Sequence, residues 1–254
     1  MHVELHDLGL IEYQEAWSRQ EQYAAEIAAG QRSPTLLLLE HPPVYTFGRK
    51  GHAENLLWGE EQLKARGVRV LWVDRGGDVT YHGPGQLVGY PLIPLGSIGD
   101  LRVQPASTDA SPPAFHPTRI PQVDYIDYLR KLERLLIVAL ARVGLAAGQQ
   151  PGLTGVWVQP DVYSRCPRCR PEDREKPAKI AAIGVKVDAR GISHHGFSLN
   201  VDPYMTDWDG IIACGLADHP VVSLADLVSP VPDMFRVKRE VTRAFGEVFE
   251  CEVT

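Results

Sequence analysis

The chain lacks the long apolar run that a membrane-spanning helix requires. None of its 254 residues falls in a stretch that approaches about 20 apolar residues. The first residues, MHVELHDLGLIEY, contain neither a basic leader nor an apolar core, so we expect no signal peptide there. Both absences predict a cytoplasmic protein that needs no membrane partner.

Positive charge and cysteine are also scarce. The 26 Lys and Arg residues stand against 32 Asp and Glu, for a net charge of -6, and no dense basic run occurs. This balance argues against a nucleic-acid partner. The cysteines are few and unevenly spaced, unlike a disulfide framework, which fits a reducing cytoplasm. They are Cys166, Cys169, Cys214 and Cys251.

The remaining composition is that of an ordinary globular protein, with 44% hydrophobic and 23% charged residues. A chain of this length can bury a sizeable core, so we expect one domain over residues 1–254. Two stretches, at about 94–121 and 159–178, are rich in Pro and polar residues and lack periodicity. We expect both to be insertion-like loops.

Strand-like and helix-like patterns are intermixed along the chain, which predicts an α/β (α+β) fold. Short apolar runs predict strands at residues 3–8, 35–39, 68–73, 86–93, 155–158, 180–187, 192–201 and 247–253. Periodic patterns with terminal glycines predict helices from Tyr13 to Gly30, at residues 60–66 and at 123–143. A short helix after Ser223 and a longer one at residues 233–245 are predicted near the end.

The stretch RGGDVTYHGPGQLVGYP, residues 75–91, is the most unusual part of the sequence. Its paired glycines permit close backbone approaches, and Pro84-Gly85 indicates a tight turn. The flanking apolar runs predict strand, glycine-rich bend, strand. A plain β-turn is one interpretation. The dense set of Arg75, Thr80, His82 and Gln86 favours a loop that lines a ligand site.

Three further features admit ordinary interpretations when taken alone. Lys179 begins an apolar strand, where it is either a solvated strand end or a half-buried proton carrier. Cys214, before a glycine in an apolar run, is typical of a small buried hydrophobe. The Cys166-x-x-Cys169 pair supplies only two of the roughly four ligands of a structural zinc. We therefore assign no metal, and a zinc pair, a redox pair and free thiols all stay open.

Four motifs in order resemble those of the lipoyl(octanoyl) transferases of lipoate biosynthesis. They are RGGxxTYHGPGQ from Arg75, KIAxIG from Lys179, HGF at residues 195–197, and the Cys-Gly pair at Cys214. The segment EHPPVYT, which contains His41 as an apparent loop histidine, is also typical of these enzymes. The resemblance implies a large mixed sheet and a small sheet flanked by helices, similar to biotin and lipoate protein ligase catalytic domains.

The resemblance also implies a site and its partners. Cys214 and Lys179 would be catalytic, and no cofactor would be required. The donor would be octanoyl-acyl carrier protein, and the acceptors would be lipoyl domains of 2-oxo acid dehydrogenases and the glycine cleavage H protein. The acyl group would contact Arg75, Gly76, Gly77, Asp78, Val79, Thr80, Tyr81, His82, Ala182, Ile183, Gly184, His195, Gly196 and Phe197.

A cysteine nucleophile divides acyl transfer between two large partners into two easier steps. The lysine would either attract the thiolate as an ammonium or take the thiol proton as an amine. Backbone N–H groups at residues 182–184 or 76–77 are candidates for stabilising the oxyanion. Two other functions stay open: an ATP-dependent lipoate or biotin ligase and a non-catalytic acyl-binding module. Neither gives Cys214 and Lys179 a joint task.

Overall fold

The computed structural model describes residues 2–95, 125–163, 171–216 and 219–254. Most of the predicted loop at 94–121 lies outside these residues. Cys166 and Cys169, with the centre of the second predicted insertion, lie outside them as well.

Within the described residues, the strands form an 8-stranded sheet of order β11-β1-β2-β6-β10-β9-β8-β7. Strand β1 pairs in parallel with β11 and β2, and the remaining pairings are antiparallel, so the sheet is mixed. Its strands are β1 (His2–Leu10), β2 (Thr35–Glu40), β6 (Gln86–Leu92), β7 (Gly148–Gln150), β8 (Leu153–Val158), β9 (Ala178–Val187), β10 (Ser193–Asn200) and β11 (Glu252–Val253).

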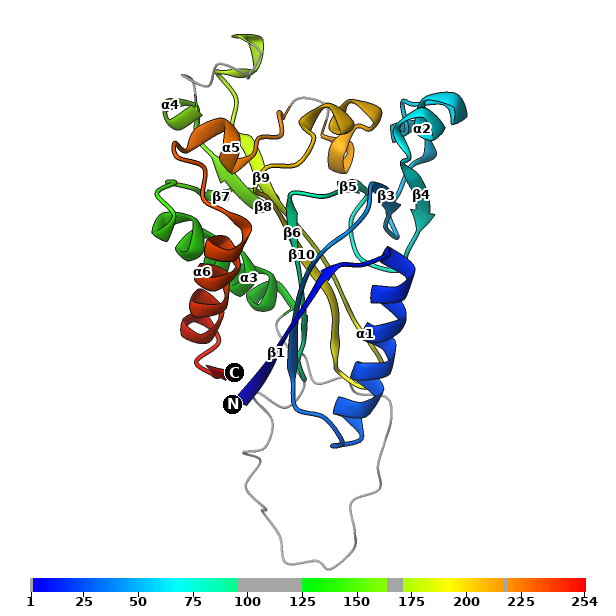
Figure 1. Cartoon of the computed structure of the whole chain (residues 1–254), viewed down its shortest axis with the longest axis vertical. Helices are drawn as coiled ribbons and strands as arrows, with labels where there is room; N and C mark the ends of the chain where they lie inside the picture. Colours follow the sequence, from blue (N-terminus) through cyan, green and yellow to red (C-terminus); the bar gives the residue numbers. More distant parts are fainter. Residues whose placement is uncertain (1, 96–124, 164–170, 217–218) are drawn as a thin grey trace, which may run out of the picture.

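A 3-stranded sheet of order β4-β3-β5 stands beside the upper part of the large sheet (Figure 1). Strand β3 (Val44–Phe47) is central, with β4 (Arg69–Trp72) parallel to it and β5 (Val79–His82) antiparallel. The predicted class, a large mixed sheet and a small sheet flanked by helices, is confirmed.

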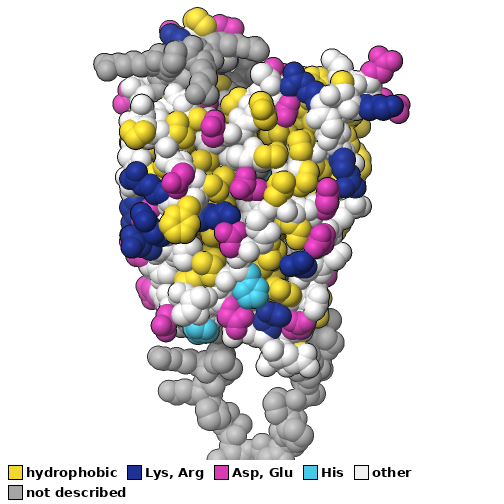
Figure 2. Space-filling model, in the orientation of Figure 1, with side chains coloured by type: hydrophobic (Ala, Val, Ile, Leu, Met, Phe, Trp, Pro, Cys, Tyr) yellow, Lys and Arg dark blue, Asp and Glu magenta, His cyan; other side chains and the backbone are white. Residues whose placement is uncertain are grey.

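Helices cover both faces of the large sheet (Figure 1). Helices α3 (Tyr125–Arg142) and α6 (Met234–Val248) pack together on one face, and α1 (Tyr13–Ala28) lies on the other. The shorter helices are α2 (Glu60–Arg66), α4 (Pro160–Tyr163), α5 (Leu224–Leu227), η1 (Ala53–Asn55), η2 (Pro171–Asp173), η3 (Met205–Gly210) and η4 (Ala213–Gly215). Among the described helices, none is long and apolar enough to cross a membrane. On the face in Figure 2, side chains of both charge signs occur among apolar ones.

The alternation of side chains along β2 explains why the large sheet is covered on both faces. Leu36 and Leu38 belong to the core cluster under α3 and α6. Leu37 and Leu39 point the other way and belong to the cluster under α1. Because successive strand residues face opposite sides, a continuous leucine run requires a helix layer on each side.

The predicted strand at residues 247–253 is wrong over most of its length. Helix α6 continues to Val248, and only Glu252–Val253 form strand β11. The ring of Phe249 stacks on that of Phe245 with centroids 4.5 Å apart and meets the edge of Tyr128 on α3. This packing one helical turn after Phe245 favours an additional turn of helix over an early strand.

The glycine-rich stretch at residues 75–91 is more elaborate than the predicted strand, bend, strand. Strand β5 lies inside it, and both β4 and β5 pair with β3, a strand that the sequence did not indicate. Strand β6, which follows the turn at Gly85, belongs to the large sheet. The stretch therefore crosses from the small sheet to the large one and places its polar residues between them.

Candidate active site

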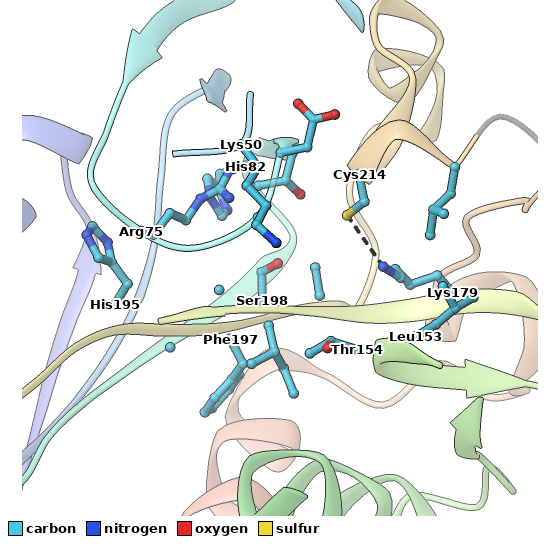
Figure 3. Close-up of a pocket in the computed structure, with 18 of the residues that line it drawn as sticks. Lys50, Arg75, His82, Leu153, Thr154, Lys179, His195, Phe197, Ser198 and Cys214 are labelled. Carbon is cyan, nitrogen blue, oxygen red and sulfur yellow. Dashed lines mark hydrogen bonds between the residues drawn. The ribbon is translucent and has the colours of Figure 1, made fainter. Parts of the chain in front are cut away.

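A cavity of about 450 Å³ lies where β5, β9, β10 and η4 meet (Figure 3). It brings together residues from all four sequence motifs, which are far apart along the chain. The predicted site residues that line it are Arg75, Gly77, Asp78, Thr80, His82, Lys179, Ala182, Ile183, Gly184, His195, Gly196, Phe197 and Cys214.

Lys179 and Cys214 form a pair at one side of this cavity. The Lys179 Nζ donates a hydrogen bond to the Cys214 Sγ at 3.4 Å (Figure 3). Lys179 is only 7% exposed, and its ammonium lies 4.8 Å from the centre of the Trp157 ring, a cation–π contact. Of the two interpretations of this lysine, the structure therefore supports the half-buried one over the solvated strand end.

Backbone pairing fixes the relative position of the two residues. The Lys179 N–H donates to the Pro220 carbonyl, and the Val222 N–H donates to the Lys179 carbonyl. The segment that follows η4 is thereby tied to the start of β9. The ordered backbone on both sides holds the lysine at the thiol, so the geometry of the pair is preorganised.

Cys214 itself has an uncommon backbone conformation. Its φ of 56° lies in the left-handed region, which side chains other than Asn, Asp and His rarely adopt. Such a conformation costs on the order of 1 kcal/mol or more and persists only where the surroundings enforce it. Here it turns a partly exposed thiol toward Lys179 rather than burying it in the core as a small hydrophobe.

The Arg75 side chain organises the glycine-rich bend. Its buried guanidinium donates to the carbonyl and hydroxyl oxygens of Thr46 and to the Gly76 carbonyl. A Cβ on Gly48 would come within 2.4 Å of the Gly77 carbonyl oxygen, and one on Gly184 within 3.1 Å of the arginine. The bend thus packs directly on β9, and most of the arginine's hydrogen-bonding capacity serves the protein itself.

Asp78 links this bend to the turn that carries the cysteine. Its carboxylate accepts hydrogen bonds from the Val79 and His52 N–H groups and from the Asn55 amide. The Asn55 carbonyl in turn accepts from the Ile212 N–H, two residues before Cys214. We therefore interpret Asp78 as a residue that positions loops around the thiol.

Three of the predicted contact residues do not line the cavity: Gly76, Val79 and Tyr81. Strand alternation explains two of them, because Val79 and Tyr81 face away from Thr80 and His82. Both are fully buried in the core cluster of the small sheet, and the Tyr81 hydroxyl donates to Asp207 at 2.9 Å. Gly76 contributes its N–H to the Val185 carbonyl.

Comparison with known proteins explains why these motifs occur together. The family model described as "Lipoyl protein ligase A/B catalytic domain" matches residues 12–106 and 114–246. An octanoyltransferase of Chloroflexus aurantiacus is 41% identical over 98% of this chain and 94% of its own length. An octanoyltransferase of Rubrobacter xylanophilus is 39% identical over 94% of this chain and 90% of its own. This chain belongs to the lipoyl protein ligase A/B family. Like these relatives, it is an acyltransferase.

Solved structures of the lipoyl protein ligase family share the fold. A bi-partite lipoate protein ligase of Thermoplasma acidophilum has a TM-score of 0.62 at 14% identity, covering 100% of this chain and 85% of its own. Lipoate-protein ligase A bound with ATP has the same TM-score and identity, covering 100% and 87%. These likenesses confirm the predicted similarity to lipoate protein ligase catalytic domains at the level of fold.

The HGF motif of this family member has a packing role that its sequence did not reveal. A Cβ on Gly196 would come within 2.2 Å of the Gly89 carbonyl oxygen, and one on Gly89 within 2.2 Å of the Phe197 ring. The lack of a side chain at both positions therefore lets the neighbouring strands β6 and β10 pair closely, with the Phe197 ring lying over Gly89. Gly196 serves the wall of the cavity through its lack of a side chain.

Sequence reasoning missed a group of aromatic residues around the same cavity. Tyr13 and Tyr90 line it, and His41 packs behind them. The sequence predicts Tyr13 only as the start of a helix and His41 as a loop histidine, whereas the His41 side chain is fully buried. Because aromatic residues on an apolar face usually indicate core packing, the pattern offered no sign of a ligand site.

The hydrogen bonds of His41 and His82 fix their tautomers. His41 Nδ1 lies 2.8 Å from the Ile11 carbonyl, so it donates there, and Nε2 accepts from the Tyr90 hydroxyl at 2.8 Å. His82 Nδ1 donates to the Gln86 Oε1 at 2.8 Å, because the Gln86 amide nitrogen is engaged elsewhere. Each ring is neutral and satisfied.

His195 completes the group. Its Nε2 donates to Asp74 at 2.8 Å, and its Nδ1 faces the Tyr13 hydroxyl at 3.4 Å. Asp74 also binds the Lys186 ammonium at 2.5 Å, and these partners hold the pKa of its carboxyl well below the usual value. Burial lowers the pKa of His195 even though the Asp74 charge opposes that shift. Burial likewise raises the pKa of Tyr13 to about 12.

The buried histidines predict a loss of stability in mild acid. Burial lowers the pKa of His41 to about 4 and that of His82 well below its ordinary value. In the unfolded chain each titrates near 6.5, so below that pH only the unfolded state gains the proton. The stabilisation is present above about pH 6.5 and is lost as the pH decreases, by about 2 kcal/mol at pH 5 for His41 and in the same direction for His82. Denaturant unfolding between pH 7.5 and 5 measures this, and a His41→Gln variant should lose about 2 kcal/mol of the dependence. If the unfolding free energies of the wild type and His41→Gln depended equally on pH, buried neutral His41 would not be the cause.

In the described part of the chain, no group of three or more His, Cys, Asp or Glu side chains is arranged to hold a metal ion. The two described cysteines, Cys214 and Cys251, are both free thiols.

Proposed function

We propose that the protein transfers an octanoyl group from octanoyl-acyl carrier protein to a lysine of a lipoyl domain, through a thioester on Cys214. The observation that carries the proposal is the hydrogen bond between the Lys179 Nζ and the Cys214 Sγ at the cavity wall. Its octanoyltransferase relatives support the acyl group. Lipoyl domains of 2-oxo acid dehydrogenases and the glycine cleavage H protein are the acceptors that this chemistry would serve.

The first half-reaction forms the acyl-enzyme. Lys179 takes the proton of the Cys214 thiol, and the thiolate attacks the carbonyl carbon of the donor thioester. The tetrahedral intermediate then expels the thiolate of the carrier. The Lys179 ammonium returns its proton to that leaving group, so the products are the free carrier thiol, a neutral lysine and an octanoyl thioester on Cys214.

The second half-reaction regenerates the pair. The neutral amine of the acceptor lysine attacks the Cys214 thioester and forms the amide bond. Lys179 accepts the proton that the amine loses, and Cys214 leaves as the thiolate. The enzyme then has an ammonium beside a thiolate again, ready for another donor.

Stabilising the tetrahedral intermediate requires donors near the oxyanion. Of the two amides in the glycine pair, that of Gly76 already donates to Val185. The N–H of Gly77, whose residue lines the cavity, has no partner among the described residues. We therefore assign it as a candidate oxyanion donor. The acyl chain would lie along Ala182 and Gly184 on the cavity side of β9, where each buried methylene contributes about 0.8 kcal/mol.

The dependence on ATP tests this proposal. The enzyme is incubated with a lipoyl domain and either octanoyl-acyl carrier protein without ATP or free octanoate with ATP, and the mass of the lipoyl domain is measured. Gain of one octanoyl group from the carrier without ATP supports the transferase. Modification only with octanoate and ATP would identify a ligase, and no modification in either case would leave an acyl-binding module.

A further inference from the structure

The cavity has a second end, away from the catalytic pair, that the chemistry above does not use. Four buried rings line it: Tyr13, His82, Tyr90 and His195. Figure 3 shows His195 on the opposite side of the cavity from Cys214 and Lys179. An acyl chain attached to Cys214 and extended along the cavity would approach these rings.

The length of strand β5 allows the distance from the cysteine turn to the four rings to be estimated. Asp78 directly precedes this strand, and a Cβ on Gly215 would lie 3.0 Å from its carboxylate, which places Asp78 beside the cysteine turn. Thr80 and His82 follow on the same strand face and both line the cavity. His82 is four positions after Asp78, a distance of about 13 Å at the usual rise of a strand.

The length of an octanoyl group matches this distance. Eight carbons joined by bonds of about 1.5 Å extend roughly 9 Å. A van der Waals contact of about 4 Å at the far end brings the total to about 13 Å. The terminal methyl of an extended octanoyl chain parallel to β5 thus reaches the His82 ring, and a longer chain meets an obstacle.

The obstacle is rigid. The Tyr13 ring stacks on His82 with centroids 5.7 Å apart and packs against His41 at 4.8 Å. The His82 Nδ1 is engaged with Gln86, and its Nε2 lies 3.5 Å from the Thr46 hydroxyl. Because these hydrogen bonds are made within the protein, displacing the rings would break them, and a longer chain offers no replacement.

We propose that Tyr13 and His82 form an end wall that limits the acyl chain to about eight carbons. This inference rests on the proposed function, since it takes Cys214 as the point of attachment. The contact between α1 and β5, rather than the catalytic pair, would then determine which acyl chain lengths the enzyme accepts.

The test compares acyl-enzyme formation from hexanoyl, octanoyl, decanoyl and dodecanoyl carrier protein by intact mass. In the wild type the rate should fall beyond octanoyl. Tyr13→Ala removes the ring behind His82 and should raise the decanoyl-to-octanoyl rate ratio by roughly tenfold, since two more methylenes become buried. Tyr13→Phe, which keeps the ring and loses only the hydroxyl, should retain the wild-type profile.

Thermal unfolding identifies variants that fail to fold. Tyr13→Leu is a second variant that removes the aromatic ring. A folded Tyr13→Ala or Tyr13→Leu protein with the wild-type ratio would overturn the end wall while leaving the transferase intact. A wild-type enzyme that forms no adduct with any chain length would instead overturn the proposed function, and the end wall with it.

Discussion

Replacing Cys214 by alanine is expected to lower octanoyl transfer by about four orders of magnitude or more, to the level of the uncatalysed background. The thiol sulfur is the atom to which the acyl group would be attached, and no other cysteine of the described residues lines the cavity. Its one hydrogen bond among the described residues is to Lys179, and it is partly exposed, so the fold should be retained. The rate of octanoylation of a lipoyl domain measures the effect.

Cys251→Ala is the matched control. Cys251 is the other described free cysteine, and it precedes β11, packed against the α3 and α6 layer. Its replacement should leave the transfer rate within about twofold. If Cys214→Ala retained a tenth of wild-type activity while folded, catalysis would not proceed through that thiol.

Replacing Lys179 by alanine is expected to lower transfer by about 10²- to 10⁴-fold. In the proposed mechanism the loss would have two causes, because the Lys179 Nζ would both stabilise the Cys214 thiolate and carry protons in each half-reaction. Lys179→Arg separates them: arginine keeps a positive charge but does not give up its proton. We therefore expect the arginine variant to be nearly as inactive as the alanine variant.

A small primary amine added to Lys179→Ala should restore part of the activity, because it can occupy the space of the lost ammonium beside the Trp157 ring. Rescue of this kind would not be expected if the lysine served only the fold. Lys64, an exposed lysine on α2, provides the control, and Lys64→Ala should show neither the loss nor the rescue. Full activity of Lys179→Arg would show that charge alone suffices.

The elements that the sequence predicted well depend on local patterns. Helix α2 has the predicted bounds and ends at Gly67, whose φ of 65° suits glycine. Helix α3 lies within the predicted range, with Leu132, Leu136 and Leu140 fully buried as the leucine stripe required. In these cases spacing along the chain and burial in the fold report the same periodicity.

The elements that the sequence patterns did not predict depend on contacts with residues distant in sequence. Strand β3 is a short segment after Pro42-Pro43, and it becomes a strand by pairing with β4 and β5. The last turn of α6 forms because Phe249 packs on Phe245 and Tyr128. Neither contact can be derived from local propensity, since tertiary packing outweighs it at such positions.

The candidate site was predictable to the extent that its residues stand in motifs. Motifs at Arg75, Lys179, His195 and Cys214 meet at one cavity. Strand alternation could have separated Tyr81, which faces the small-sheet core, from its neighbours. Tyr13 lies outside the motifs, and Tyr90 lies in the apolar run that follows RGGxxTYHGPGQ. Neither was predicted as a site residue, because their patterns indicate core packing. The catalytic and binding roles of all these residues stay predictions.

The most direct test of the account is intact mass spectrometry after incubation with octanoyl-acyl carrier protein in the absence of ATP and acceptor. We predict a gain of one octanoyl group that hydroxylamine removes, that peptide mapping assigns to Cys214, and that a lipoyl domain discharges. A gain mapped to another residue, or transfer to the lipoyl domain with no adduct in rapidly quenched samples, would contradict the thioester on Cys214.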